Sequence, residues 1–264
     1  MEDYKGKVVV VTGACGGIGS VIARMFAQAG ASLGICDIRQ EKLDQLAGDL
    51  ERSRTQVYSA PVDVTDQKHV HKFCEEAARS LGGIDYLVNT VGIVDNMGDV
   101  EDLSLETWNS TLAVNLSSAF LLAKFSVPHM KTKGGGAIVN ISSVSGMANQ
   151  LGVMVYSVTK AGMISLTKSE AIDLARYNIR ANSICPASVE TPMLHEAAGL
   201  VGKETGRTPE EQWQYWASQY PTQRFTKPKE IAELALFLCS DRAANITGAS
   251  FVIDGGLTAL LPER

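Results

Sequence analysis

Three residues in the second half of the chain have the types and spacing of an acid–base site. Tyr156 and Lys160 are four residues apart, and on a helix this spacing places both side chains on one face. An ammonium group beside a phenol favours the phenolate, so we expect Lys160 to lower the pKa of Tyr156 from its reference near ~10. Such a phenol can act as general acid or general base. Ser143, thirteen residues before Tyr156, can hydrogen-bond an oxygen on which negative charge develops.

A second group of residues has the pattern of a phosphate-binding loop. The run Thr12–Gly19, TGACGGIG, follows an apolar run and precedes a helical pattern. Its glycines let the backbone approach a pyrophosphate closely, and the N–H groups that open the next helix attract the negative charge. We therefore expect this loop to bind a dinucleotide.

Asp37 lies eighteen residues after the last glycine of this loop. A carboxylate at that distance can accept hydrogen bonds from the adenosine ribose hydroxyls, and it would repel the 2′-phosphate of NADP. Arg39 argues the other way, because an arginine can pair with that phosphate. We interpret the pair as favouring NAD over NADP. The alternative is that Asp37 only caps the helix that starts near Gln40.

Short apolar runs alternate along the chain with stretches of helical period. Apolar runs predict strands at 7–12, 33–36, 57–60, 84–88, 137–141, 179–185 and 250–253. Between them, helices are expected after the glycine loop, around 43–50, at 66–81, within 105–133, at 155–177 and at 228–240. Strands that are apolar on both faces indicate a parallel sheet covered on both sides. We predict an α/β fold with one doubly wound domain over 1–264, about seven parallel strands and helices on both faces.

One region, about 187–227, departs from this alternation. A long insertion after the carboxyl end of a strand is a common place for ligand binding in such sheets. We interpret it as a substrate-binding insertion, and the alternative is an excursion that only packs its own aromatic residues, Trp213, Tyr215, Trp216 and Tyr220.

Composition excludes several other classes of protein. Hydrophobic residues make up 45% and charged residues 20%, which is ordinary for a globular chain. The net charge of −5, with no basic run, argues against nucleic acid or an anionic membrane as partner. The five cysteines have no C-x-x-C spacing and the four histidines have no metal-ligand spacing, so we expect no metal site and a reduced, cytoplasmic location. We expect no signal peptide, and no apolar stretch long enough to cross a membrane.

Cys15 lies within the glycine loop, near the start of the expected helix. Such a position can lower the pKa of a thiol, which would make oxidative inhibition conceivable. The simpler interpretation is a small residue that fills a tight turn.

In combination these motifs resemble the classical short-chain dehydrogenase/reductase family, over nearly the whole chain. The motifs that carry the resemblance are Thr12–Gly19, Asn89-Thr90-Val91-Gly92, Asn115, Ser143, Tyr156-x-x-x-Lys160, Pro186 with Thr191, and Ile246-Thr247-Gly248 with Asp254-Gly255-Gly256. The resemblance implies a Rossmann-type fold and an NAD(H)-dependent oxidoreductase that interconverts a secondary alcohol and its ketone. Ser142 is a rival to Ser143, but the family's spacing to the tyrosine favours Ser143.

The resemblance also assigns roles to individual residues. The catalytic set would be Asn115, Ser143, Tyr156 and Lys160, with Asn115 holding a water that extends the proton path from Lys160. Cofactor contacts would come from Thr12, Gly13, Cys15, Gly16, Gly17, Ile18, Gly19, Asp37, Ile38, Asp63, Val64, Asn89, Gly92, Tyr156, Lys160, Pro186, Val189 and Thr191. Substrate contacts would come from Ser143, Ser145, Met154, Tyr156, Ala187 and Met193. Family members are usually homotetramers, which implies the same assembly here.

Two departures from the family pattern bear on the shape of the substrate site. Thr90 and Val91 stand where Asn-Ala is common, and Ala187 stands where Gly is common after Pro186. Because alanine tolerates a positive φ less well than glycine, the turn at Ala187 would be more restricted.

Apolar side chains around the expected pocket favour a cyclic or apolar substrate over a sugar or polyol. The expected walls are 145–154, 94–96 and 187–220, and no Arg or Lys falls within 187–201. Lys203, Arg207 and Arg224 could still reach an anionic group. Two further alternatives are a dinucleotide-binding sensor or scaffold without turnover, and another nucleotide-dependent enzyme such as a methyltransferase. The tyrosine–lysine pair has no purpose in either of them.

Overall fold

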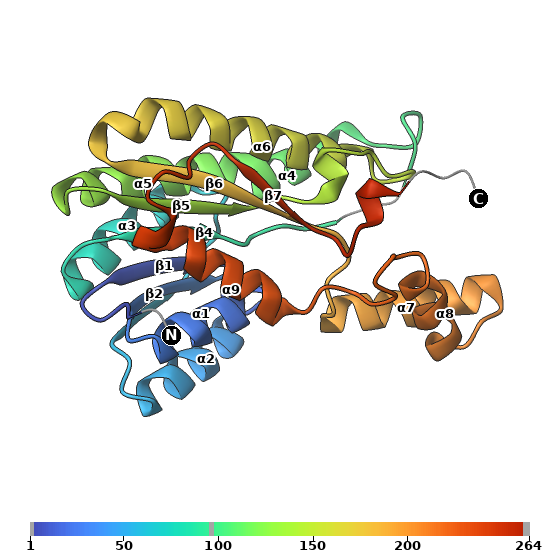
Figure 1. The fold of residues 1–264 in the computed structure, drawn as a ribbon, viewed down its shortest axis with the longest axis horizontal. Coiled ribbons are helices and arrows are strands. Elements are labelled where there is room, and N and C mark those ends of the chain that lie inside the picture. The colour runs from blue at the N-terminus through green and yellow to red at the C-terminus, as the bar shows by residue number, and fades with distance from the viewer. Residues whose placement is uncertain (1–2, 95–97, 261–264) are drawn as a thin grey trace.

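A parallel β-sheet forms the centre of the molecule (Figure 1). The structure, a computed structural model, describes residues 3–94 and 98–260. Within these ranges the sheet has seven strands in the order β3-β2-β1-β4-β5-β6-β7, and every pair of neighbours is parallel. The strands are β1 Val8–Thr12, β2 Ser32–Asp37, β3 Val57–Pro61, β4 Tyr86–Asn89, β5 Gly136–Ile141, β6 Ile179–Pro186 and β7 Ser250–Ile253. The expected doubly wound α/β fold is confirmed.

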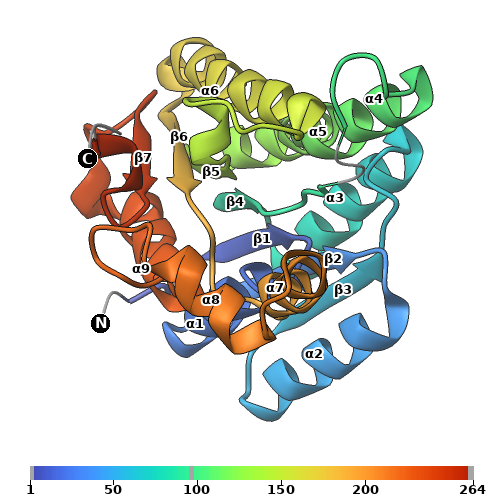
Figure 2. The ribbon, with the colours of Figure 1, turned by 90° about the vertical axis from the view of Figure 1, so that its right-hand side faces the viewer.

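Helices cover both faces of this sheet (Figure 1). One layer contains α1 (Gly19–Gln28), α2 (Gln40–Arg52) and α9 (Pro228–Cys239). The opposite layer contains α3 (Gln67–Leu81), α4 (Leu105–Leu112), α5 (Ser118–Thr132) and α6 (Met154–Leu174). Two further helices, α7 (Pro192–Thr205) and α8 (Pro209–Ala217), lie outside these layers, in front of the carboxyl end of β6 (Figure 2).

Strand β1 shows why the sequence reads as continuous apolar runs. Its side chains alternate between the two faces of the sheet. Val9 and Val11 belong to the core under α1, α2 and α9, whereas Val10 belongs to the core under α3 and α5. All three are fully buried. Because both faces are covered, the valine side chains are buried whichever face they point to, and Thr12 at the end of the strand is buried as well.

Strand β4 begins two residues later than the apolar run suggested, at Tyr86 and not at Ile84. Asp85, the residue before it, is held at the start of β1. Its carboxylate accepts a hydrogen bond from the N–H of Val8 at 2.9 Å, and the ammonium groups of Lys7 and Lys133 lie 3.5 Å and 3.6 Å from its oxygens. Its backbone N–H also donates to the Val8 carbonyl at 2.9 Å, and its carbonyl accepts from the N–H of Ala137 at 3.3 Å.

The expected long helix within 105–133 is confirmed as a continuous stretch, α4 and α5 joined by the π-helical segment Ala113–Ser117. Among the described residues, this stretch is the one helix long and apolar enough, by length and composition alone, to cross a membrane. Its side chains Leu122, Ala123 and Met130 are buried in the core on the sheet. A core helix passes the same test, and its apolar residues are used here for packing.

The insertion at 187–227 forms two helices that the sequence did not predict. Phe225 packs edge-to-face against Trp213 and Tyr220, with ring centroids 4.5 Å and 5.5 Å apart. These aromatic residues make a small core of their own with Ala217. Their clustering in the sequence is thus explained by packing within the insertion, while the exposed apolar side chains of α7 are Met193 and Leu200.

Candidate active site

The glycine loop between β1 and α1 leaves backbone groups free for a ligand. Gly13 has a φ of +60°, which favours glycine. A Cβ atom at Gly17 would lie 2.6 Å from the Cγ2 atom of Thr191, so the loop and the start of α7 touch. No side chain caps the N-terminus of α1, where Ile18 is the N-cap residue, and its first turn carries no acidic residue. The positive dipole end of this uncapped helix fits a pyrophosphate.

Asp37, at the end of β2, is buried and paired with neighbouring donors. Its carboxylate accepts from the N–H of Cys15 at 3.0 Å and from the N–H of Arg39 at 3.1 Å. The guanidinium of Arg39 adds two more bonds, at 2.9 Å and 3.0 Å. Burial raises the pKa of Asp37, but the hydrogen bonds from Arg39 and Cys15 outweigh it and hold the pKa below its usual value. The alternative that Asp37 caps α2 is wrong, because the N-cap residue is Arg39 and no side chain caps that helix.

Cys15 does not have the electrostatics of a reactive thiol. Burial, followed by the charge of Asp37, raises the pKa of Cys15 to about 11. The alternative of a lowered thiol pKa is not supported, because burial and then the nearby carboxylate act in the opposite direction to the helix N-terminus. A small residue filling the turn is the interpretation that fits.

The other residues expected near a cofactor follow the strands at the same edge of the sheet. Ile38 and Asp63 are exposed, and Asp63 accepts bonds from the N–H and hydroxyl of Thr65 at 2.9 Å and 2.6 Å. Val64 and Asn89 are buried. Later in the chain, Pro186 ends β6, and Val189 is buried and forms a β-bridge with Thr226. In the glycine loop, Gly16 belongs to the turn before α1, and Gly19 is the first residue of that helix.

The end of β5 is held directly against helix α6. The hydroxyl of Ser142 donates to the carbonyl of Lys160 at 2.8 Å, and the ammonium of Lys160 donates to the carbonyl of Ile141 at 3.0 Å. A Cβ atom at Gly146 would lie 2.5 Å from the carbonyl carbon of Lys160. The turn after β5 can therefore contact the backbone of α6 only because residue 146 is glycine.

This contact brings the hydroxyls of Ser143 and Tyr156 together. Ser143 is buried in extended backbone, and its Oγ accepts from the N–H of Ser145 at 3.1 Å. Burial raises the pKa of Tyr156, and its hydrogen bond with Ser143 opposes that shift. The Ser142 hydroxyl is used by the backbone of α6, so of the two serines it is Ser143 that contacts the phenol.

Lys160 acts on Tyr156 differently from what the spacing predicted. Its ammonium lies 5.5 Å from the centroid of the tyrosine ring, which confirms that both share a helix face. The prediction that Lys160 lowers the pKa of Tyr156 is nevertheless wrong for the protein without a ligand, because burial dominates that pKa. Burial also lowers the pKa of Lys160 to about 8. A low-polarity site thus disfavours the charged form of both groups.

Asn115 lies in the π-helical segment and fixes the chain after β4. Its Oδ1 accepts from the N–H of Ile93 at 2.8 Å, while its Nδ2 donates to the Ile93 carbonyl at 2.9 Å and to Thr159 Oγ1 at 3.2 Å. A Cβ atom at Gly92 would lie 3.2 Å from Lys160 Nζ and 3.8 Å from Asn115 Oδ1. Asn115, Lys160 and Gly92 therefore meet at one point. Ile93 and Thr159 were missed by the sequence analysis, because a backbone contact and an ordinary helix threonine leave no signal.

The residues expected to contact substrate lie around this point with different exposure. Met154 and Met193 are exposed and Ser145 is buried. Ala187 packs against the aromatic core of the insertion. It is not among the residues with positive φ, so the expectation that alanine restricts this turn is wrong. Of the expected wall at 94–96, Val94 is exposed, and Asp95 and Asn96 lie outside the described residues.

Two arginines that could have anchored an anionic substrate are already occupied. Arg207 donates to Gln212 Oε1 at 3.1 Å and stacks on Tyr215. Arg224 forms two bonds with the carboxylate of Glu230, at 2.9 Å and 2.7 Å. Within 3–94 and 98–260 no group of three His, Cys, Asp or Glu side chains is placed to hold a metal ion.

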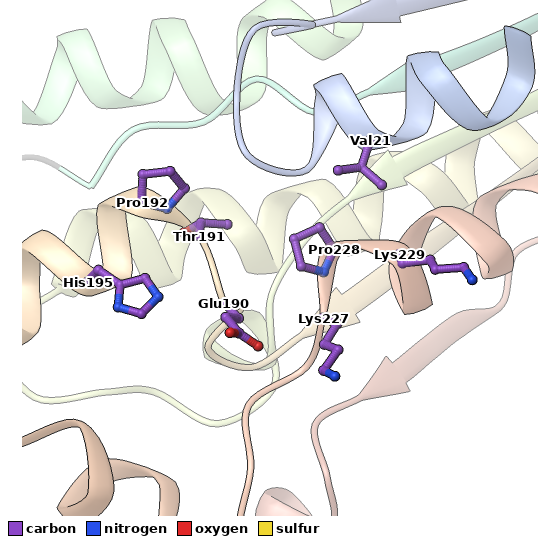
Figure 3. Close-up of a pocket in the computed structure, with 8 residues that line it drawn as sticks. All are labelled: Val21, Glu190, Thr191, Pro192, His195, Lys227, Pro228 and Lys229. Atoms are coloured by element: carbon purple, nitrogen blue, oxygen red, sulfur yellow. The ribbon is translucent and has the colours of Figure 1, made fainter. Parts of the chain in front are cut away.

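A groove of about 720 Å³ lies where α1, the start of α7 and the start of α9 meet (Figure 3). The sequence analysis missed most of its lining residues, which are Val21, Glu190, Thr191, Pro192, His195, Lys227, Pro228 and Lys229. Ser143, Tyr156 and Lys160 do not line it. Thr191 contacts this groove and Gly17, so it separates the groove from the glycine loop.

The chain is similar to known proteins along almost its full length. The model of a family described as enoyl-(acyl carrier protein) reductase matches residues 13–258. The 3-oxoacyl-[acyl-carrier-protein] reductase FabG of Thermotoga maritima is 38% identical over 96% of this chain and 98% of its own length. The cis-4-hydroxycyclohexanecarboxylate dehydrogenase of Sinomonas cyclohexanicum is 35% identical over 98% of this chain and 99% of its own. The structure of L-sorbose reductase from Gluconobacter frateurii, complexed with NADPH and L-sorbose, superposes with a TM-score of 0.93 at 32% identity, covering 98% of this chain and 99% of that one.

The contact at Gly146 gives a prediction about stability. In the variant Gly146→Ala the new methyl group overlaps the backbone of α6, so we expect it to destabilise the fold by about 1–3 kcal/mol, as overpacking does in other proteins. Gly199→Ala is the matched control, because a Cβ there meets nothing within 4 Å and residue 199 lies inside α7. The control should be neutral or more stable by about 0.5–1 kcal/mol, since alanine is the better helix former. Urea denaturation measures both, and equal stability of the two variants would contradict the contact.

Proposed function

The chain belongs to the classical short-chain dehydrogenase/reductase family, and from that premise we propose that it interconverts a secondary alcohol and its ketone with Tyr156 as general acid/base. Relatives in this family are oxidoreductases named for alcohol, polyol and sugar substrates. The observation that carries the proposal is the position of Tyr156: the ammonium of the buried Lys160 lies 5.5 Å from its ring centroid, and the buried Ser143 is close enough to lower its pKa.

A dinucleotide bound at the glycine loop would supply the hydride chemistry. In ketone reduction the phenol of Tyr156 gives its proton to the carbonyl oxygen, and in alcohol oxidation the phenolate takes a proton back. Ser143 donates a hydrogen bond to the same oxygen, where negative charge develops. Because burial raises the pKa of Tyr156, the phenol is protonated at neutral pH and ready to act as an acid.

Lys160 and Asn115 support this proton transfer in the proposal. The charged ammonium of Lys160 stabilises the phenolate electrostatically, an effect that weakens as pH rises past its pKa of about 8. Asn115 fixes the Ile93 backbone beside Lys160 Nζ, and we assign to it the water that carries protons onward to Lys160. The alternative of a sensor or scaffold without turnover leaves this buried lysine without a purpose.

For the cofactor we propose NAD(H). Asp37 provides a buried carboxylate at the end of β2 for the ribose hydroxyls, and the Arg39 guanidinium is paired with that carboxylate and not free for a phosphate. The contacts proposed from the sequence are kept: the glycine loop, Ile38, Asp63, Val64, Asn89, Gly92, Pro186, Val189 and Thr191. NADP is the alternative, and the L-sorbose reductase complex with NADPH gives it weight.

For the substrate we propose a cyclic or apolar secondary alcohol. Exposed apolar side chains follow several elements at the carboxyl edge of the sheet: Val94, Met147, Leu151, Met154 and Met193. The guanidinium groups of Arg207 and Arg224 are already hydrogen-bonded to Gln212 and Glu230, so we do not expect either arginine to bind an anionic substrate. A relative that acts on a cyclohexane ring supports this class, and L-sorbose reductase supports a sugar or polyol as the alternative. Equal rates on cyclic ketones and on polyols would exclude the proposal.

A single domain with a substrate-binding insertion, a homotetramer and a cytoplasmic location stay predictions from the sequence. The exposed side chains of Phe120 on α5 and of Val158 and Ile172 on α6 are compatible with an assembly through these helices.

The variant Tyr156→Phe tests the catalytic role. Turnover should fall by about 10²–10⁴-fold, the usual contribution of a positioned acid or base, while NADH binding measured by fluorescence stays within a factor of about two. Tyr215→Phe, at an exposed tyrosine of α8, is the control and should keep full turnover. Full activity of the Tyr156 variant would contradict the assignment.

A fluorescence titration with NADH and with NADPH tests the cofactor. We expect NADH to bind at least about tenfold more tightly, because a hydrogen bond to a charged group contributes about 1.5–3 kcal/mol. Asp37→Ala should remove this preference, since it also frees Arg39. The control Asp44→Asn, on the exposed face of α2, should leave it unchanged. Tighter binding of NADPH to the unmodified protein would overturn the NAD proposal, and binding of neither would overturn the proposed function.

A further inference from the structure

A buried chain of polar side chains runs from β4 through β5 to α6. The Nδ2 of Asn89 donates to the Oδ1 of Asn140 at 2.8 Å, and the Nδ2 of Asn140 donates to Glu170 Oε2 at 2.8 Å and to Thr167 Oγ1 at 2.9 Å. The exposed fractions of Asn89, Asn140 and Glu170 are 4%, 0% and 8%. The mechanism above uses none of the bonds in this chain.

One end of the chain lies beside the glycine loop. Asn89 is the last residue of β4 and is paired in register with Thr12, the last residue of β1. Thr90, the next residue, donates its N–H to Thr12 Oγ1 at 3.3 Å. Asn89 therefore lies at the edge of the sheet where the dinucleotide is proposed to bind.

Each end of the chain carries an acceptor without a partner. Asn89 Oδ1 and Glu170 Oε1 are both buried without a hydrogen bond in the part of the molecule that the structure describes. Leaving a buried polar atom unpaired is costly, so an arrangement that pairs one of these atoms is favoured. The neighbouring amide of Asn140 presents its oxygen to Asn89 and therefore offers no donor to Asn89 Oδ1.

Glu170 is the member of this chain that can gain a proton. Burial raises the pKa of Glu170 to about 7, and the hydrogen bond from Asn140 opposes the shift. The carboxyl of Glu170 accepts from the amide of Asn140 on β5. The hydroxyl of Thr167, from α6 itself, accepts from the same amide and donates to the carbonyl of Met163 at 2.8 Å. No charged side chain of β4, β5, β6 or the π-helical segment contributes to the shift, and none of the described residues forms an ion pair with Glu170. Its protonation therefore depends on burial and on this chain alone.

A proton on Glu170 allows the hydrogen bonds that link Glu170, Asn140 and Asn89 to exchange donor and acceptor. The protonated carboxyl becomes a donor, so the amide of Asn140 can turn its oxygen toward it. The Nδ2 of Asn140 then faces Asn89, and the Asn89 amide turns its Oδ1 inward to accept that bond. The unpaired acceptor of Asn89 is thereby satisfied, and its NH₂ group takes the place that the oxygen held.

We propose that Glu170 is a positioning residue that sets, through Asn140, whether Asn89 presents its oxygen or its amide NH₂ group at the dinucleotide edge of the sheet. This inference rests on the proposed function, because it assumes that a dinucleotide binds there. If Glu170 acts in this way, the affinity for the dinucleotide depends on pH near neutrality, although Glu170 lies on the far side of β5 from the glycine loop.

The first arm of the test needs no dinucleotide. Because the folded pKa of Glu170 is about 7 and its ordinary value is 4.5, the folded protein binds the extra proton between these values and loses this stabilisation as pH rises. We expect the Tm of the unmodified protein to fall relative to that of Glu170→Gln over this range and to run parallel above it. Asp173→Asn, an exposed position on the same helix, is the control and should follow the unmodified protein.

The second arm measures the Kd of NADH at several pH values. In the unmodified protein and in Asp173→Asn we expect the Kd to change by about fivefold or more between about pH 6 and pH 8, the lower end of coupling between linked sites. In Glu170→Gln this change should disappear, because glutamine does not titrate. Asn89→Ala should also remove the pH dependence of the Kd while keeping the pH profile of the Tm, since Glu170 still titrates there.

The outcomes separate the two proposals. If the Tm profile responds to Glu170→Gln but the Kd profile does not, Glu170 is only a structural titrating group and the inference is wrong. Parallel Tm profiles for Glu170→Gln and the unmodified protein overturn it as well. If the unmodified protein binds neither NADH nor NADPH, the proposed function fails, and the assumption on which this inference rests fails with it.

Discussion

The close contact between the end of β5 and the backbone of α6 is the interaction on which the site depends. Two hydrogen bonds hold this contact: the Lys160 ammonium donates to the Ile141 carbonyl, and the Ser142 hydroxyl donates to the Lys160 carbonyl. Gly146 allows the close approach, because it lies directly against the backbone of Lys160. This contact excludes water from Lys160 and brings Ser143 to Tyr156. The same exclusion raises the pKa of Tyr156 and lowers that of Lys160 to about 8. Without a ligand the phenol of Tyr156 is therefore neutral, and a positively charged ligand beside it would lower its pKa.

Elsewhere along the carboxyl edge of the sheet, some buried polar atoms are hydrogen-bonded and others have no partner. Asp37 is paired with Arg39 and Cys15, which stabilises its charge although it is buried. The N–H groups at the start of α1 have no capping side chain, and Asn89 Oδ1 has no donor. A site that keeps unpaired donors next to a satisfied carboxylate is prepared for a ligand with phosphates and hydroxyls.

The sequence predicted most of the fold because the physics of a doubly wound sheet is local. Strands such as β1 must be apolar on both faces, and α3 begins at the capping Asp66 where the helical period starts. The motif residues were found for a similar reason, since a helix places Tyr156 and Lys160 on one face by spacing alone. The contact of Asp85 with Val8 could not be predicted, because the two residues are far apart in the sequence.

What the sequence could not predict are properties that depend on burial and on long-range partners. The direction of the Tyr156 pKa shift was predicted wrongly, because spacing shows the neighbouring charge but not the loss of solvent. The pairing of Arg39 with Asp37 and the chain from Asn89 to Glu170 both need the fold to be seen. Helices α7 and α8 were missed because their apolar residues pack against each other and not on the sheet.

The ultraviolet absorbance of tyrosinate, measured as a difference between the unmodified protein and Tyr156→Phe, tests the central claim most directly. The titration is run on the protein by itself and again with saturating NAD. The account predicts that Tyr156 ionises above its ordinary pKa of 10.0 in the protein by itself, and that NAD lowers this value. Ionisation of Tyr156 at or below its ordinary value without NAD, or a value that NAD does not change, would contradict it.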